Sequence, residues 1–225
     1  MYYTFPKNGN CDEDVNDGPV NRLSRWTWNA ALNEIDQDSE VVLLDTPSTA
    51  RAQHNSGKIE FGKDGMLYVT IGDTGVNDEG QNLNSVLGGM IRLTDTGDIP
   101  SDNPFAQDPE GVRCHLTGRG DGKCQELYAV GLRNPFRFAM NPNTEGNKIH
   151  FYVNDVGASA WEEISEGGDD FEDNSVFGYE LGIQNFGWPE REGPCKRQED
   201  GGCDDYEGFM HPIHYYQHQG EFCRQ

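Results

Sequence analysis

Basic residues, long apolar runs and helical periodicity are all scarce in this sequence. Lys and Arg number 17 against 39 Asp and Glu, which gives a formal net charge of −22. Nucleic acid and anionic membrane surfaces would repel such a protein, so we expect neither as a partner. No apolar run approaches the roughly 20 residues that cross a bilayer, and no membrane span is expected. The lack of long segments with helical spacing excludes an all-helical bundle.

Zinc-type cysteine spacing is also missing. Zinc sites need two cysteines separated by two to four residues, or nearby histidine pairs. Instead, two pairs of cysteines flank short glycine-containing loops: Cys114 with Cys124, and Cys195 with Cys203. We therefore expect two loop-closing disulfides.

Disulfides persist in oxidising compartments, so the pattern predicts a secreted, extracellular or periplasmic protein. Cys11 and Cys223 have no close neighbour in sequence, and the sequence leaves open whether they pair with each other or with cysteines outside this chain. The first residues, Met-Tyr-Tyr-Thr-Phe, lack the basic start and apolar core of a signal peptide. We expect an N-terminus that is missing or processed.

Short β-type segments recur along the chain and are separated by turn residues such as Asp-Gly and Asn-Pro-Asn. The expected strands are residues 23–28, 41–44, 59–61, 67–71, 90–93, 127–130, 136–140 and 149–153. Only residues 81–87 have the pattern of a short helix. The profile predicts an all-β protein, either a sandwich, a barrel or a propeller.

An internal repeat favours the propeller. Residues 59–69 read as strand, tight turn and strand ending in Tyr68-Val69, and residues 138–153 repeat this with a longer turn before Tyr152-Val153. The spacing of the two Tyr-Val pairs is close to two propeller blades of ~40–50 residues each. Each pair leads into a glycine-containing loop.

Three acidic stretches, at residues 12–14, 169–173 and 204–205, are most simply solvated loops. The more specific alternative is that their carboxylates coordinate calcium. None of the three has the spacing of a calcium-binding loop, so we do not assign metal to them.

Four ordered segments carry the functional signal. The first begins with His-Asn-Ser-Gly at 54–57 and ends with Thr-Ile-Gly-Asp at 70–73; the second spans 87–105 and includes Leu-Gly-Gly-Met. The third is Gly-Leu-Arg-Asn-Pro-Phe-Arg-Phe at 131–138. The fourth joins Asn-Asp-Val-Gly-Ala-Ser-Ala-Trp-Glu-Glu-Ile at 154–164 to Asn-Phe-Gly-Trp-Pro at 185–189.

Their order and spacing resemble the glucose/sorbosone dehydrogenase family, which includes soluble quinoprotein sugar dehydrogenases and hedgehog-interacting-protein-like propellers. The resemblance covers nearly the whole chain. It implies a six-bladed β-propeller that holds pyrroloquinoline quinone (PQQ) and Ca²⁺ and oxidises the anomeric hydroxyl of aldoses to a lactone.

The resemblance also assigns roles to residues. His54 matches the catalytic base, and a neutral imidazole can take the proton of a sugar hydroxyl. Arg133 and Asn134 match the pair that contacts the quinone oxygens, where a fixed positive charge suits an oxygen that becomes negative. A histidine or arginine without this motif would more simply be a packed side chain or an ion-pair partner.

Two calcium sites are implied as well. The carbonyl groups of Gly157 and Ala158 match the ligands of the cofactor's calcium, although some members have proline at the second position. Glu162 with the carbonyls of Glu163 and Phe186 matches a second, structural site, where Phe186 replaces the usual tyrosine. Carboxylate and carbonyl oxygens suit Ca²⁺. The simpler alternative is an outer strand with solvated glutamates.

Family members extend beyond the segment that this chain matches. We therefore expect residues 1–225 to form a single, partial propeller domain of about four blades, without the first and last ones. An open arc of blades would expose strand edges, so missing blades or a partner chain should complete it.

The leading functional hypothesis is PQQ-dependent oxidation of an aldose by base-assisted hydride transfer, with an unknown electron acceptor. The alternative is a non-catalytic extracellular propeller that binds a protein or a carbohydrate. Fold alone does not separate the two. His54 together with Arg133 and Asn134 favours the enzyme, whereas the cysteines and acidic loops suit either function.

Overall fold

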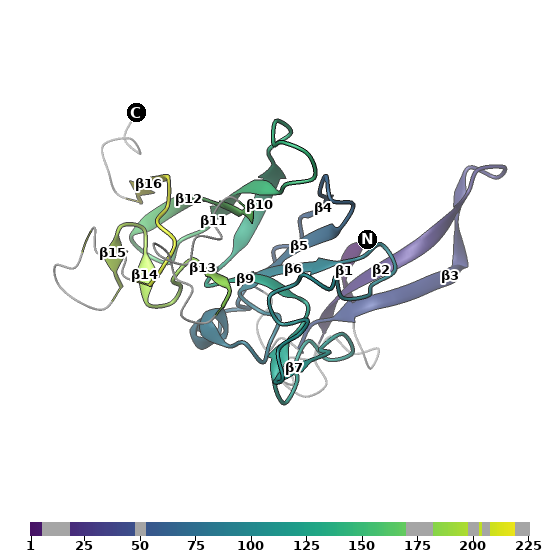
Figure 1. Ribbon diagram of the computed structural model, residues 1–225, viewed down its shortest axis with the longest axis horizontal. Helices are drawn as coiled ribbons and strands as arrows, with labels where there is room; N and C mark the ends of the chain where they lie inside the picture. The colour runs from purple at the N-terminus through teal and green to yellow at the C-terminus, as the bar shows by residue number, and fades with distance from the viewer. Residues whose placement is uncertain (6–18, 48–52, 170–181, 198–202, 204–207, 219–225) are drawn as a thin grey trace.

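A computed structural model describes residues 1–5, 19–47, 53–169, 182–197, 203 and 208–218 (Figure 1). These residues form short strands and one 3₁₀ helix, η1 (Asn77–Gln81), and none of them belongs to an α-helix. Among them there is accordingly no helix that is long and apolar enough to cross a membrane. Cys11, Cys223 and most of the acidic stretches lie outside the described residues.

The N-terminal sheet has three antiparallel strands in the order β1-β2-β3. They are β1 (Tyr2–Phe5), β2 (Val20–Asn29) and β3 (Glu34–Asp45). The β2–β3 hairpin projects from the rest of the molecule (Figure 1, purple). Its tip is exposed, while its base buries Leu23, Leu43 and Leu44.

The central sheet has five strands in the order β13-β9-β6-β5-β4. Its pairs are antiparallel except for β13 and β9, which run parallel. The strands are β4 (Ile59–Phe61), β5 (Leu67–Ile71), β6 (Gly89–Leu93), β9 (Leu127–Val130) and β13 (Gln184–Asn185).

The third sheet is an antiparallel arrangement of four strands in the order β10-β11-β12-β16. They are β10 (Pro135–Met140), β11 (His150–Asp155), β12 (Trp161–Gly168) and β16 (His214–Gln217). Two small ladders complete the described strands: β7 (Gly111–Val112) with β8 (Lys123–Cys124), and β14 (Arg191–Glu192) with β15 (Cys195–Lys196).

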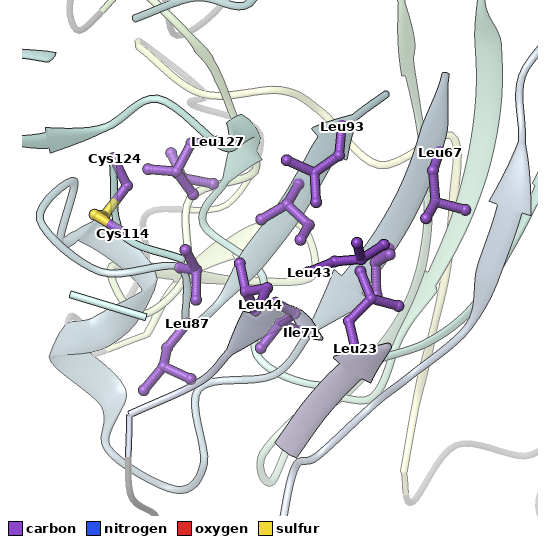
Figure 2. Close-up of a cluster of buried hydrophobic side chains, with 14 of the residues drawn as sticks. Leu23, Leu43, Leu44, Leu67, Ile71, Leu87, Leu93, Cys114, Cys124 and Leu127 are labelled. Carbon is purple, nitrogen blue, oxygen red and sulfur yellow. A yellow bond between two sulfur atoms is a disulfide. The ribbon is translucent and has the colours of Figure 1, made fainter. Parts of the chain in front are cut away.

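The central sheet packs against a sheet on each of its faces. In β5, Leu67, Val69 and Ile71 enter one hydrophobic cluster and Tyr68 enters another, because successive side chains of a strand point to opposite faces. The first cluster contains Leu23 and Leu44 of the N-terminal sheet (Figure 2). The second contains Phe138, Phe151 and Val153 of the third sheet. The three sheets are therefore stacked, as neighbouring blades of a propeller are.

Every strand expected from the sequence is present, at least in part, but the expected helix at 81–87 is wrong. The helical turn lies earlier, at Asn77–Gln81, and Asn82 is already extended with φ −90° and ψ 97°. The Asn82 side chain accepts the N–H of Asn84 at 3.1 Å, a local hydrogen bond that competes with helix formation. Ser85 then forms a β-bridge with Arg119.

Both expected disulfides are present. Cys114–Cys124 closes a loop with a sequence separation of 10 residues, and its sulfur atoms are buried at the edge of the first hydrophobic cluster (Figure 2). Cys195–Cys203 has a separation of 8 residues and begins in strand β15. The second bridge ties Cys203 to the β14–β15 hairpin.

Candidate functional site

Parts of all four motif segments meet at one end of the stacked sheets. Strands β5, β9 and β13 run in the same direction, and the loops that follow them leave the central sheet at one edge. The loop after β9 leads directly into β10 of the third sheet, so the turn from β11 to β12 lies at the same end. Sequence segments that are far apart therefore meet there.

His54 is held at this end by a buried aspartate. Its Nδ1 lies 2.6 Å from Oδ1 of Asp73, which is completely buried, while the imidazole is 14% exposed. The Asp73 carboxylate also accepts the Gly75 N–H at 2.7 Å and the Trp188 indole N–H at 2.9 Å. A carboxylate is an acceptor, so Nδ1 carries the hydrogen and, in the neutral imidazole, Nε2 keeps its lone pair.

The backbone around His54 has an uncommon conformation. His54 and Ser56 have φ values of 52° and 53°, in the left-handed region that non-glycine residues rarely adopt. Such residues cluster at functional sites, where the surrounding structure holds them in place. Here, Gly72 packs against the His54 carbonyl so closely that a Cβ atom at position 72 would overlap it. The two segments are therefore fixed against each other.

Arg133 points into the β11–β12 turn. Its Nη1 donates to the Val156 carbonyl at 2.9 Å and to the Gly157 carbonyl at 2.8 Å. The guanidinium carbon lies 5.4 Å from the centre of the Trp188 ring, within cation–π range. Its Nε is buried and has no hydrogen-bond partner among the described residues.

Asp155 fixes the backbone at Arg133 and Asn134. Its two carboxylate oxygens accept the N–H of Arg133 at 2.8 Å and of Asn134 at 2.6 Å. Burial raises the pKa of Asp155 to about 7, although these two hydrogen bonds and the Arg133 charge act in the opposite direction.

Hydrogen bonds join the two halves of the site. The Asp73 N–H donates to the Arg133 carbonyl at 2.8 Å, and the Ser56 hydroxyl donates to Oδ1 of Asn134 at 3.2 Å. The structure therefore brings His54, Arg133, Asn134 and Gly157 into one connected group. Ala158 belongs to the same β11–β12 turn as Gly157.

The residues of the expected second calcium site are less closely connected. The Glu162 carboxylate accepts the Gly157 N–H at 3.1 Å and contacts Nε2 of His218 at 2.7 Å. Glu163 accepts the Gly193 N–H, and Phe186 packs beside Phe151 in the second hydrophobic cluster. In the described part of the chain, no hydrogen bond or ring contact links Phe186 to either glutamate.

Glu163 is partly buried. Burial raises the pKa of its carboxyl group to about 8, and the nearby Asp155 carboxylate adds to this effect. Its backbone pairs with Asp155 of β11 on one side and with Tyr215 of β16 on the other. A second calcium site at these residues therefore stays a prediction.

Sequence reasoning missed three functional candidates, namely Asp73, Trp188 and Glu192. The first two lie within motif segments, but only the fold shows that they contact each other across 115 positions of sequence. Glu192 accepts hydrogen bonds from the turn that contains Ala158. The recurrence of a buried aspartate after each Tyr-Val pair, Asp73 after β5 and Asp155 at the end of β11, is a signal that could have identified the first.

Comparisons with known proteins identify relatives of this chain. The family model for Glucose / Sorbosone dehydrogenase matches residues 1–221. Aldose sugar dehydrogenase YliI of Escherichia coli (strain K12) is 30% identical over 128 residues, which is 57% of this chain and 30% of that protein. HIPL1 protein of Arabidopsis thaliana is 32% identical over 180 residues, or 69% of this chain and 21% of that protein.

Solved structures show the same fold. The PQQ-bound form of aldose sugar dehydrogenase from Streptomyces coelicolor superposes with a TM-score of 0.60 and 23% identity, and the match covers 88% of this chain and 46% of that one. The chain thus spans less than half the length of each of these relatives. Its described residues form the sheets of a β-propeller, and the chain belongs to the glucose/sorbosone dehydrogenase family.

Proposed function

We propose that this chain supplies the central catalytic residues of a quinoprotein that oxidises aldose sugars with PQQ and Ca²⁺. The observation that carries the proposal is the hydrogen bond between His54 Nδ1 and the buried Asp73 carboxylate. Similarity to an aldose sugar dehydrogenase and to a PQQ-bound structure supports the same function.

His54 is the proposed general base. Because Asp73 holds the hydrogen on Nδ1, Nε2 is free to take the proton of the anomeric hydroxyl. As that O–H bond breaks, the hydrogen on the anomeric carbon leaves with its electron pair, and the carbon–oxygen double bond of the lactone forms. PQQ, when bound, would supply the acceptor for this hydride, and Ca²⁺ would supply a Lewis acid.

The residues present fit such a cofactor. Arg133 has a buried Nε with no partner among the described residues, beside the aromatic ring of Trp188. A fixed positive charge at this place would stabilise an oxygen that gains negative charge. The Gly157 carbonyl, which already accepts from Arg133, and the Ala158 carbonyl would hold the calcium. Glu162, Glu163 and Phe186 remain our candidates for the second, structural calcium site.

The expected compartment is extracellular or periplasmic, because both described disulfides would be reduced in a cytosol. The expected substrate is a small aldose. We assign no electron acceptor.

The alternative function is a non-catalytic propeller that binds a protein or carbohydrate partner. The similarity to HIPL1 protein, at 32% identity, supports it. The two functions differ in their dependence on His54. Partner binding does not require a proton acceptor at His54, whereas sugar oxidation does.

The discriminating experiment is an aldose-dependent dye-reduction assay of the full-length protein reconstituted with PQQ and CaCl₂. We expect turnover with the wild type and a kcat lower by about 10²–10⁴-fold in His54→Ala, the usual contribution of a general base. His150→Gln is the matched control, because His150 lies at the opposite end of β11 and contacts Glu166. A protein that binds PQQ but oxidises no member of a broad aldose panel would support the binding propeller instead.

A further inference from the structure

One carboxylate oxygen organises the whole β11–β12 turn. Oε1 of Glu192 accepts four successive backbone N–H groups, from residues 158, 159, 160 and 161, at 2.8, 2.8, 2.9 and 3.2 Å. Glu192 lies in β14 and is only 3% exposed. Successive N–H groups that converge in this way form a concave anion-binding nest, and here the anion is a side chain of the same chain.

This arrangement determines where the carbonyl groups point. In a planar trans peptide, the C=O of one residue is directed opposite to the N–H of the next. Since the N–H groups of Ala158 and Ser159 point at Glu192, the carbonyls of Gly157 and Ala158 point away from it. The contact between the Gly157 carbonyl and Nη1 of Arg133, at 2.8 Å, shows the side to which the first of them is directed.

The turn has no room for a side chain at Gly157. A Cβ atom at Gly157 would overlap the Trp161 carbonyl and lie 3.0 Å from Oε1 of Glu192. The Glu162 carboxylate accepts the remaining N–H of this stretch, from Gly157, at 3.1 Å. Five successive N–H groups, of residues 157–161, are therefore bonded to two glutamates.

Glu192 is suited to this role as an anion. Burial by itself opposes its ionisation, but the four backbone N–H groups outweigh burial and lower the pKa of Glu192 below its usual value. Hydrogen bonds to an ionised acceptor are roughly twice as strong as those between neutral groups. The charge therefore matters for holding the turn, and not only the shape of the side chain.

We propose that Glu192 is the positioning residue of the cofactor's calcium site. From behind the β11–β12 turn it orients the Gly157 and Ala158 carbonyls toward the side where Arg133 lies, and it acts on a bound cation only through this turn. The inference rests on the proposed function, because it assigns the carbonyls of Gly157 and Ala158 to Ca²⁺.

The test compares Glu192→Gln and Glu192→Ala with Glu126→Gln in the full-length protein. Glu126 is the matched control, since it is completely buried and accepts the N–H of Cys114 at 3.0 Å. It therefore lies at the Cys114–Cys124 disulfide, away from the β11–β12 turn. The first readout is amide hydrogen exchange at residues 158–161. The second is the affinity for Ca²⁺, from calorimetric titration of CaCl₂ into the protein in the presence of PQQ.

We expect faster exchange at 158–161 in both Glu192 variants and a Ca²⁺ affinity about 10–100-fold lower, as is usual when a residue that supports a metal ligand is replaced. Glu192→Gln should lose less than Glu192→Ala, because its amide oxygen still accepts hydrogen bonds. Glu126→Gln should leave the amide exchange at 158–161 and the Ca²⁺ affinity unchanged, even if it lowers the Tm as much as the Glu192 variants do. Glu192→Gln keeps the shape of the side chain, so it remains informative if Glu192→Ala does not fold.

The outcomes separate the two claims. Wild-type protein that binds Ca²⁺ and PQQ, with a Glu192→Gln variant of equal affinity, would overturn the positioning role alone. So would faster exchange at 158–161 with unchanged affinity. Wild-type protein that takes up neither Ca²⁺ nor PQQ would overturn the proposed function, and the positioning role with it.

Discussion

At the scale of single residues, two buried aspartates perform matching tasks. Asp73 follows β5 and holds the imidazole of His54, while Asp155 ends β11 and holds the backbone at Arg133 and Asn134. Both follow a Tyr-Val pair, so the internal repeat delivers one carboxylate from each sheet to the same end of the molecule. The proposed base and the proposed cofactor-binding arginine are thus each oriented by a buried aspartate that follows a Tyr-Val pair, four residues after Val69 and two residues after Val153.

Replacing Asp73 with Asn should remove the control of the His54 tautomer. An amide can donate to Nδ1, and the hydrogen then moves to Nε2, where it blocks proton uptake. We expect kcat in the dye-reduction assay to fall by about 10²–10⁴-fold with little change in PQQ affinity.

Trp188→Phe is the control for this variant, because it removes one hydrogen bond to the same carboxylate and keeps an aromatic ring near Arg133. Its loss of kcat should be much smaller. An Asp73→Asn enzyme with wild-type kcat would show that Asp73 does not set the protonation state of His54.

At the scale of elements, the strands that could be predicted are those with local signals. β5 and β9 are short apolar segments bounded by turn residues, and their bounds match the expectation. The first half of β3 is polar, acidic and exposed, so its pairing with β2 gave no hydrophobic pattern to detect. The helix expected at 81–87 failed because the side chain of Asn82 forms a local turn.

Some residues of the candidate site could be predicted from the sequence and others could not. The resemblance supplied His54, Arg133, Asn134 and Gly157, which the fold brings together. Glu192 could not be found in this way, because its four partners lie 31–34 residues earlier in the chain and only folding brings them to its carboxylate.

The β14–β15 hairpin yields a prediction about the two disulfides. Glu192 pairs in register with Cys195, so Cys195–Cys203 restrains the hairpin that carries Glu192, whereas Cys114–Cys124 lies beside the hydrophobic cluster of the central sheet. Replacing either pair with serines should lower the free energy of unfolding by about 2–4 kcal/mol, measured by urea denaturation.

Only the Cys195→Ser/Cys203→Ser protein should also bind Ca²⁺ more weakly, by about tenfold. Equal Ca²⁺ affinities in the two double variants would argue against mechanical support of the site by this hairpin.

At the scale of the whole molecule, the large negative charge includes carboxyl groups that folding buries in part or almost completely. The pKa of Glu163 is raised by burial from an ordinary 4.5 to about 8, and the pKa of Asp155 is raised from 3.8 to about 7. At a pH between the ordinary pKa and the raised pKa of each group, the folded protein holds a proton that the unfolded chain releases. Its free energy of unfolding therefore falls as the pH rises through this window.

Glu163→Gln should flatten this pH dependence, because the amide does not titrate. In calcium-free buffer, we expect the free energy of unfolding of the wild type to fall by about 1–3 kcal/mol more than that of the variant between about pH 5 and about pH 8. Urea denaturation over this range provides the measurement. Glu60→Gln is the control, since Glu60 is partly exposed beside Lys58. Parallel pH profiles of wild type and Glu163→Gln would mean that Glu163 is ionised in the folded protein.

The most direct test of the central claim is a single-turnover experiment with the full-length protein, loaded with PQQ and Ca²⁺ and mixed with excess aldose without any dye. We measure the lactone formed per bound cofactor. The site geometry predicts about one lactone per cofactor in the wild type, and far slower formation in His54→Ala protein that still binds the cofactor. Loaded wild-type protein that forms no lactone, or a His54→Ala variant that forms it at the wild-type rate, would contradict the assignment of this site to sugar oxidation.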